Sequence, residues 1–112
     1  MSGKHQRAEV YWAHLDPAVG REQARTRPCA IVSDSVINQR RGTVVVVPLT
    51  TTVQAAAFPL LVALPSMGEH TKARTEHIRA IDKSRLGRLA GTLSAQDMAE
   101  LGAAIKKVLA LV

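Results

Sequence analysis

Short runs of apolar and β-branched residues, separated by turn residues, constrain the fold of this chain more than any other feature. They predict five strands, over residues 9–15, 29–33, 43–47, 58–64 and 75–81. The third run has the strongest β propensity, and we expect Pro48 to end it because proline lacks the N–H that a strand ladder needs. Residues 38–42 are predicted to form a basic turn.

The periodicity changes near the C-terminus. Apolar residues recur there at helical spacing, at Met98, Leu101, Ile105, Val108, Leu109 and Val112. Ser94 followed by Asp97 resembles a capping box in which aspartate replaces the usual glutamate. A shorter helical turn is expected over residues 83–89. Strands followed by a helix predict an α+β fold, a small antiparallel barrel or curled sheet with helices packed on it.

The length of 112 residues is that of one domain, and we interpret residues 1–8 as a basic N-terminal tail and 9–112 as the domain. A domain of this size buries only about two thirds of its unfolded surface, so burial against a second copy is favourable and a homodimer is expected. The longest apolar run, 44–49, is far shorter than the roughly 18 residues of a membrane span. The single cysteine, Cys29, excludes an internal disulfide and favours the cytoplasm.

The charge balance favours a polyanionic partner. The formal net charge is +6, and ten arginines stand against five lysines. A planar guanidinium binds two phosphate oxygens at once, so we expect Arg21, Arg25, Arg40 and Arg41 to contact phosphates. Solubility alone is the alternative explanation of this charge.

A charged loop carries the candidate chemistry. RNA can be cut without a metal ion because its own 2′-hydroxyl can attack the neighbouring phosphate. The protein must then remove a proton, stabilise negative charge and protonate the leaving oxygen. Residues 21–27 place the Glu22 carboxylate among Arg21, Arg25 and Arg27 and can supply these functions, or can be an ordinary solvated loop.

Three motifs, in this order and spacing, resemble the MazF/PemK/Kid toxins. They are a Gly-x-Glu-Gln-x-x-x-Arg-Pro loop at 20–28, a Pro-Leu-Thr sequence at 48–50, and the run Glu76-His77-Ile78-Arg79. The resemblance extends from about Arg7 to the C-terminus. It implies a small SH3-like antiparallel β-barrel, like those of CcdB and PemK, with a C-terminal amphipathic helix, and a twofold homodimer that binds RNA along grooves at its interface.

The implied function is that of the toxin component of a type II toxin–antitoxin system. Such a toxin cuts single-stranded RNA within a short recognition sequence and inhibits translation. The products carry 2′,3′-cyclic phosphate and 5′-hydroxyl ends. No metal and no cofactor is implied, and the expected partners are RNA and a cognate acidic antitoxin whose disordered segment folds along the basic toxin.

By the same resemblance Arg27 and Thr50 are the catalytic pair. Arg27 neutralises the pentavalent phosphorane, and Thr50 donates its hydroxyl to a phosphate oxygen, unless that hydroxyl only satisfies a turn. Glu22 is expected to position RNA or transfer a proton. Glu76 and His77 correspond to an acid–amide pair that orients RNA. His77 departs from the usual glutamine. It stacks on a base and alters base preference, takes part in proton transfer, or is an ordinary surface histidine.

Two other side chains are predicted to be structural. Trp12 lies within the first strand, so we expect it to pack in the core or at a dimer interface instead of stacking on a base. Cys29 is expected to be a small buried hydrophobe. The histidines at 5, 14, 70 and 77 share no metal-ligand spacing with Cys29, so no metal site is predicted.

Two other functions suit a basic domain of this kind. A CcdB-like gyrase poison resembles this fold but binds a protein and cuts nothing. Such poisons use a C-terminal tail with a tryptophan, whereas this sequence finishes with Leu109-Ala110-Leu111-Val112, which argues against poisoning. A noncatalytic SH3-like nucleic-acid-binding module is the other alternative, and the placement of Arg27 and Thr50 argues against it.

Overall fold

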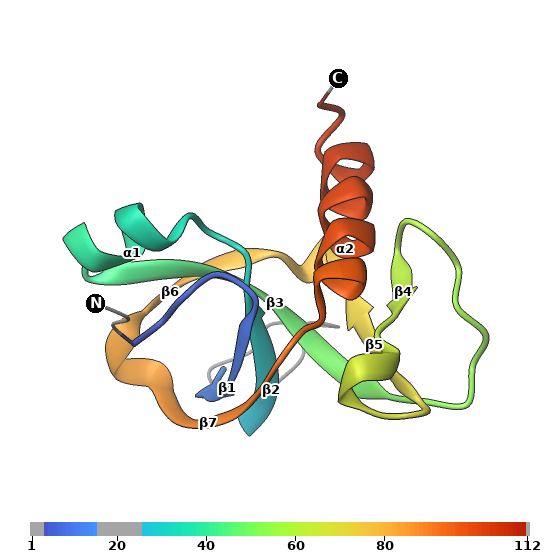
Figure 1. Cartoon of the computed structure of the whole chain (residues 1–112), viewed down its shortest axis with the longest axis horizontal. Helices are drawn as coiled ribbons and strands as arrows, with labels where there is room; N and C mark the ends of the chain where they lie inside the picture. The colour runs from blue at the N-terminus through green and yellow to red at the C-terminus, as the bar shows by residue number, and fades with distance from the viewer. Residues whose placement is uncertain (1–3, 16–25, 112) are drawn as a thin grey trace.

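A curled antiparallel sheet with one long helix packed on it forms the fold (Figure 1). The computed structural model describes residues 4–15 and 26–111. The strands are β1 Glu9–His14, β2 Thr26–Ile31, β3 Thr43–Thr51, β4 Leu61–Ala63, β5 Thr71–Arg74, β6 Arg79–Asp82 and β7 Leu86–Thr92. The helices are α1 Ser35–Arg40 and α2 Ala95–Val108, with short 3-10 turns η1 Pro65–Met67, η2 Thr75–His77 and η3 Lys83–Arg85.

The predicted α+β class is confirmed. The seven described strands pair in the order β4-β5-β3-β2-β1-β7, and β6 pairs with β3. This path is open, with β4 and β7 at its two ends, so the described pairings do not establish the predicted closed barrel.

The long strand β3 organises the sheet, and the prediction that Pro48 ends it is wrong. The strand continues through Pro48 to Thr51. One of its edges pairs with β6 up to Val46 and then with β5 from Leu49, so Pro48 lies in the gap between two ladders. Proline is tolerated there because neither ladder needs its missing N–H.

Residues 35–40 form α1, so the basic turn predicted over 38–42 is wrong for its first three residues. The sequence signal for this helix is Asp34, whose Oδ1 accepts hydrogen bonds from the backbone N–H groups of Val36 (2.9 Å) and Ile37 (3.2 Å). This is an aspartate N-cap, which begins a helix by satisfying its free donors.

Other predicted bounds are also wrong. The strand predicted over residues 58–64 is β4, which begins only at Leu61, and the strand predicted over 29–33 is β2, which begins at Thr26 and ends at Ile31. Residues 75–77 form the turn η2, and the strand predicted over 75–81 begins only at Arg79. Strands β5 and β7 were missed. The helical turn expected over 83–89 is confirmed only for its first three residues, η3, because β7 begins at Leu86. Backbone pairing with β1 holds β7 in place, despite two glycines that lower its own β propensity.

The C-terminal helix is confirmed, with one change at its start. Ser94 caps it by accepting a hydrogen bond from the Asp97 N–H (3.0 Å). The Asp97 carboxylate does not complete a capping box, because it accepts hydrogen bonds from the Ser66 N–H (2.8 Å) and the Ser66 hydroxyl instead. This contact between Asp97 and Ser66 ties η1 to α2. The helix ends at Val108, before the predicted Val112.

Two hydrophobic clusters hold these elements together. Leu101 and Ala104 of α2 pack with residues of β1 to β5, including Leu49. The second cluster contains Ile31 and Cys29, which is fully buried as predicted. Within the described ranges, no helix is long and apolar enough to cross a membrane.

Candidate active site

The ends of β2 and β3 bring Arg27 and Thr50 together. The register aligns Cys29 with Pro48, and the same antiparallel register, continued by two residues, places Arg27 opposite Thr50. Both residues line one cavity of about 380 Å³. Arg27 is exposed and Thr50 is half-buried, so a ligand in this cavity can reach both polar groups.

The rest of the cavity wall is part polar and part apolar. Its other residues are Trp12, Thr26, Pro28, Leu49, Thr51, Met67, Thr71 and Ala90. One guanidinium and several hydroxyls suit a phosphate, because both kinds of donor bind anionic oxygens. The aromatic and aliphatic wall suits the face of a base. No described carboxylate lines this cavity.

Trp12 is an exposed wall of this cavity, so the core alternative of its prediction is wrong, and packing at a dimer interface stays a prediction. Its side chain is 38% exposed, and it lies opposite Pro28 in the β1–β2 register. The burial alternates along this part of β1, with Tyr11 and Ala13 buried on either side. Sequence reasoning placed Trp12 in a strand correctly but could not tell which face of the strand is covered.

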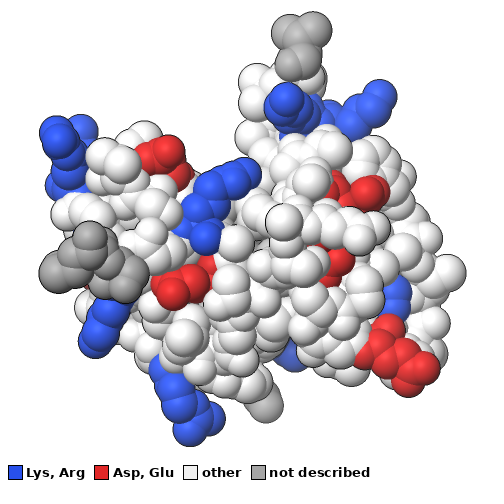
Figure 2. Space-filling model, viewed as in Figure 1, with Lys and Arg blue, Asp and Glu red and all other residues white. Residues whose placement is uncertain are grey.

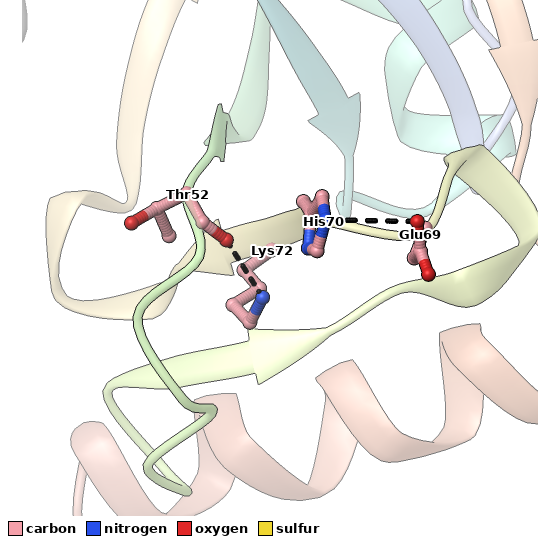
Figure 3. Close-up of polar contacts among 4 residues, drawn as sticks. All are labelled: Thr52, Glu69, His70 and Lys72. Atoms are coloured by element: carbon pink, nitrogen blue, oxygen red, sulfur yellow. Dashed lines mark hydrogen bonds and ion pairs between the residues drawn. The ribbon is translucent and has the colours of Figure 1, made fainter.

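A buried lysine supports the strand that carries Thr50. Lys72 lies opposite Thr50 in the β3–β5 register and is only 7% exposed. Its Nζ donates a hydrogen bond to the Thr52 carbonyl (3.0 Å), as Figure 3 shows. In the turn just before β5, His70 Nε2 lies 3.6 Å from Glu69 Oε2, also shown in Figure 3. Lys72 therefore fixes the chain where β3 ends, a role that no sequence motif indicated.

Glu76 and His77 do not line the cavity that holds Arg27 and Thr50. They lie in η2, where Glu76 is exposed and His77 is half-buried. His77 Nδ1 and the neighbouring Thr75 Oγ1 are buried and have no hydrogen-bond partner among the described residues. The predicted role of this pair in orienting RNA stays a prediction.

Several predicted residues lie elsewhere. Glu22, Arg21 and Arg25 lie outside the described residues. Arg40 and Arg41 are exposed at the end of α1. In residues 4–15 and 26–111, no group of three or more histidines, cysteines, aspartates and glutamates is placed to hold a metal ion.

A larger, mostly apolar groove runs along α2. It has a volume of about 810 Å³, and α2 lines it with Met98 and Lys106 and with the small residues Ala95, Ala99, Gly102 and Ala103. Val32, Val45 and Ile78 form the opposite wall. A Cβ atom added to Gly102 would meet only Arg7 Nη2, at 3.8 Å, so the packing of the single chain does not require this glycine.

Comparisons with known proteins show the family of this chain. Residues 6–109 match the model of the PemK-like, MazF-like toxins of type II toxin–antitoxin systems. Endoribonuclease MazF9 of Mycobacterium tuberculosis is 36% identical over 109 residues, which cover 89% of this chain and 92% of that protein. Endoribonuclease EndoA of Bacillus subtilis is 31% identical and covers 95% of both chains.

Solved structures show the same fold. A mycobacterial endoribonuclease in complex with its cognate antitoxin has a TM-score of 0.79 at 28% identity, with 96% of each chain covered. MazF from Deinococcus radiodurans has a TM-score of 0.79 at 25% identity, over 95% of this chain and 96% of that one. With almost its whole length matched by the family model, this chain belongs to the PemK-like, MazF-like toxins of type II toxin–antitoxin systems.

Proposed function

We propose that this protein is a toxin endoribonuclease that cuts single-stranded RNA without a metal ion. The observation that carries the proposal is the shared cavity of Arg27 and Thr50, where a cation and a hydroxyl face the same space. The endoribonuclease names of its relatives support the same reaction class. Cleavage of RNA in this way would inhibit translation.

The reaction needs no group beyond the RNA and the protein. The 2′-hydroxyl oxygen forms a bond to the adjacent phosphorus, and the bond from phosphorus to the 5′-oxygen breaks. One proton leaves the 2′-hydroxyl and one is delivered to the departing 5′-oxygen. The products are a 2′,3′-cyclic phosphate and a 5′-hydroxyl.

Arg27 and Thr50 stabilise the pentavalent intermediate. Its non-bridging oxygens carry more negative charge than the starting phosphate, so preformed donors favour it over the ground state. A guanidinium stays protonated at neutral pH, and we therefore assign Arg27 to charge stabilisation and Thr50 to hydrogen bonding. Glu22 is our proposed proton carrier because it corresponds to an acid in the loop of the family it resembles; it lies outside the described residues.

Other residues hold the RNA. Trp12 offers an aromatic face beside Arg27, on which a base next to the cleaved phosphate can stack. We assign Arg21 and Arg25 to phosphate contacts. Because Glu76 and His77 lie outside the cavity, we assign them to bases further along the RNA.

The partners we propose are a second copy of the chain and an acidic antitoxin. The groove along α2 suits a second copy, because its small side chains allow close approach and the single chain does not itself require Gly102. An acidic antitoxin segment complements the net charge of +6. A similar mycobacterial endoribonuclease was solved with its cognate antitoxin. We further propose that the curled sheet is an SH3-like β-barrel and that the protein acts in the cytoplasm.

The dimer has its own test. Ala103→Glu places a charge in the groove, whereas Gln96→Glu places the same charge on the helix surface near Ala56 and Phe58, outside the groove. We expect the first variant to be monomeric and the second to remain dimeric in sedimentation experiments. Dimers of unchanged affinity in Ala103→Glu would refute this interface.

Cleavage of a mixed RNA pool in EDTA tests the activity. Arg27→Ala and Thr50→Val are each expected to lower kcat by about 10²–10³-fold, the usual loss for one preorganised donor. Thr43→Val is the matched control, since Thr43 is exposed at the opposite end of the same strand. Wild-type rates in both variants would refute the assignment. Trapped gyrase–DNA complexes without RNA cleavage would favour a CcdB-like poison, and RNA binding without cleavage a noncatalytic module.

A further inference from the structure

A second cavity, of about 630 Å³, is lined by three cations that the proposed reaction does not use. Lys4 comes from the N-terminal residues, Lys83 from η3 and Arg88 from β7. None of the three forms an ion pair with a described residue. Figure 2 shows basic side chains projecting along the margin of the molecule that carries α1, the N-terminus and β7.

The nearby carboxylates are already occupied by other contacts. Glu9 is the one carboxylate among the described residues lining this cavity, and its Oε1 accepts hydrogen bonds from the Gln6 N–H (2.7 Å) and the Tyr11 hydroxyl (2.9 Å). Asp82, which precedes Lys83, accepts a hydrogen bond from the Ser84 N–H (2.8 Å). Hydrogen bonds from neutral donors do not cancel a carboxylate's charge, but three cations against one lining carboxylate leave this cavity with an excess of positive charge for an outside ligand.

The N-terminal wall of the cavity is held in place by α1. Asn38 Nδ2 donates to the His5 carbonyl and Gln39 Nε2 donates to the Lys4 carbonyl, both at 2.9 Å. The His5 N–H donates to the Tyr11 hydroxyl (3.1 Å), and the two rings meet edge to face at 5.1 Å between centroids. Lys4 and His5 are thus positioned before any ligand arrives, which lowers the entropy cost of binding.

The pKa of His5 is sensitive to the charges around this cavity. Burial lowers the pKa of His5 below its usual value, and the positive charges of Lys83 and Lys4 lower it further, against the opposing effect of Glu9. The ring therefore lies in a region of positive potential created by the same side chains that line the cavity.

The two cavities flank the same pair of strands. In β1, Tyr11 lines this cavity and Trp12 lines the candidate active site. In β7, Leu89 lines this cavity and Ala90 lines the candidate active site. Strand β7 is the last in the described order, so its outer edge has no further strand. An RNA strand that runs from Arg27 into the second cavity would therefore pass over this edge of the sheet.

We infer that this cavity is a second phosphate-binding site, where Lys4, Lys83 and Arg88 bind backbone phosphates of RNA extending beyond the active site. The inference rests on the proposed function, because it assigns both cavities to one RNA. The site adds affinity for longer RNA without reading its sequence, since phosphates carry no base information.

The first test compares a short oligoribonucleotide, just long enough to be cut, with a version extended at both ends. In Lys83→Ala and Arg88→Ala, cleavage of the short RNA is expected to be unchanged. For the long RNA, KM rises and the slope of log affinity against log salt falls by about 0.7 for each lost phosphate contact. Lys107→Ala, which removes a lysine charge from α2 outside this cavity, should change neither value.

A second test observes the cavity directly. Bound phosphates offset the charges of Lys83 and Lys4, so the pKa of His5, followed by NMR, should rise when a long 2′-deoxy oligonucleotide binds. An unchanged His5 pKa together with an unchanged salt slope would overturn the inference. A response to poly-glutamate but not to the oligonucleotide would overturn it too, by assigning the cavity to an acidic protein.

The two proposals fail in different ways. If the wild-type protein does not cut the short RNA, the proposed function fails. If it cuts the short RNA and the variants treat long RNA as the wild type does, only the second phosphate site fails.

Discussion

Replacing Asn38 by alanine tests how α1 holds the N-terminal residues against the domain. The side chain is fully buried and forms three hydrogen bonds. Its Nδ2 donates to the carbonyls of His5 (2.9 Å) and Ser33 (3.1 Å), and its Oδ1 accepts from the Ser33 hydroxyl. At about 0.5–1.5 kcal/mol for each bond, their loss lowers the free energy of unfolding by about 3 kcal/mol.

Urea unfolding followed by far-UV circular dichroism measures this loss. The midpoint should fall while the m-value stays constant, because the folded core is unchanged. Gln39→Ala is the control, since the exposed Gln39 side chain donates one hydrogen bond, to the Lys4 carbonyl, and should cost about 1 kcal/mol or less. A loss below about 1 kcal/mol in Asn38→Ala, or equal losses in both variants, would refute this reasoning.

Three further predictions concern single groups. Burial raises the pKa of Cys29 to about 12, so a disulfide thiol reagent at pH 8 should modify it only after unfolding, and stoichiometric labelling of the native protein would contradict this. Asp97→Ala removes both contacts to Ser66 and should destabilise the protein by about 2–3 kcal/mol, whereas Glu100→Ala, on the exposed side of α2, should stay within about 0.5 kcal/mol in the same urea experiment. Burial raises the pKa of Tyr11, and Glu9 adds to this effect although the His5 N–H opposes it. The stability that Tyr11 contributes is therefore present below pH 10 and is lost as the pH rises through the raised pKa. Ultraviolet titration of this single tyrosine should show a pKa above 10, and a pKa at or below 10 would contradict the burial argument.

The strands that the sequence predicted are those whose own residues favour extended structure. The valine run of β3 and the mixed apolar run of β1 are examples, and the helical spacing before Val108 identified α2. By contrast, β7 contains two glycines and no β-branched residue before Thr92, and it is a strand because β1 pairs with it. The continuation of β3 through Pro48 depends on where β6 ends and β5 begins, which no local pattern records.

The candidate site also contains residues that the sequence could predict and residues that only the fold reveals. Motif order identified Arg27 and Thr50, and the β2–β3 register shows why residues 23 positions apart in the sequence share one cavity. The exposure of Trp12 and the support from Lys72 depend on which faces the folded sheet covers. Asp34, in contrast, was a readable N-cap signal for α1 and hence for the wall that Lys4 and His5 form.

The 2′-hydroxyl of the RNA is the nucleophile in this account, and one substitution in the substrate tests that claim most directly. The cut position is first mapped on an all-RNA oligonucleotide in EDTA, and a second oligonucleotide then carries a single 2′-deoxy nucleotide on the 5′ side of that cut. We predict that the all-RNA substrate gives 2′,3′-cyclic phosphate and 5′-hydroxyl ends and that the deoxy substrate is not cut there. Cleavage of the deoxy substrate at the same phosphate, 5′-phosphate ends, or loss of all cleavage in EDTA would contradict the mechanism.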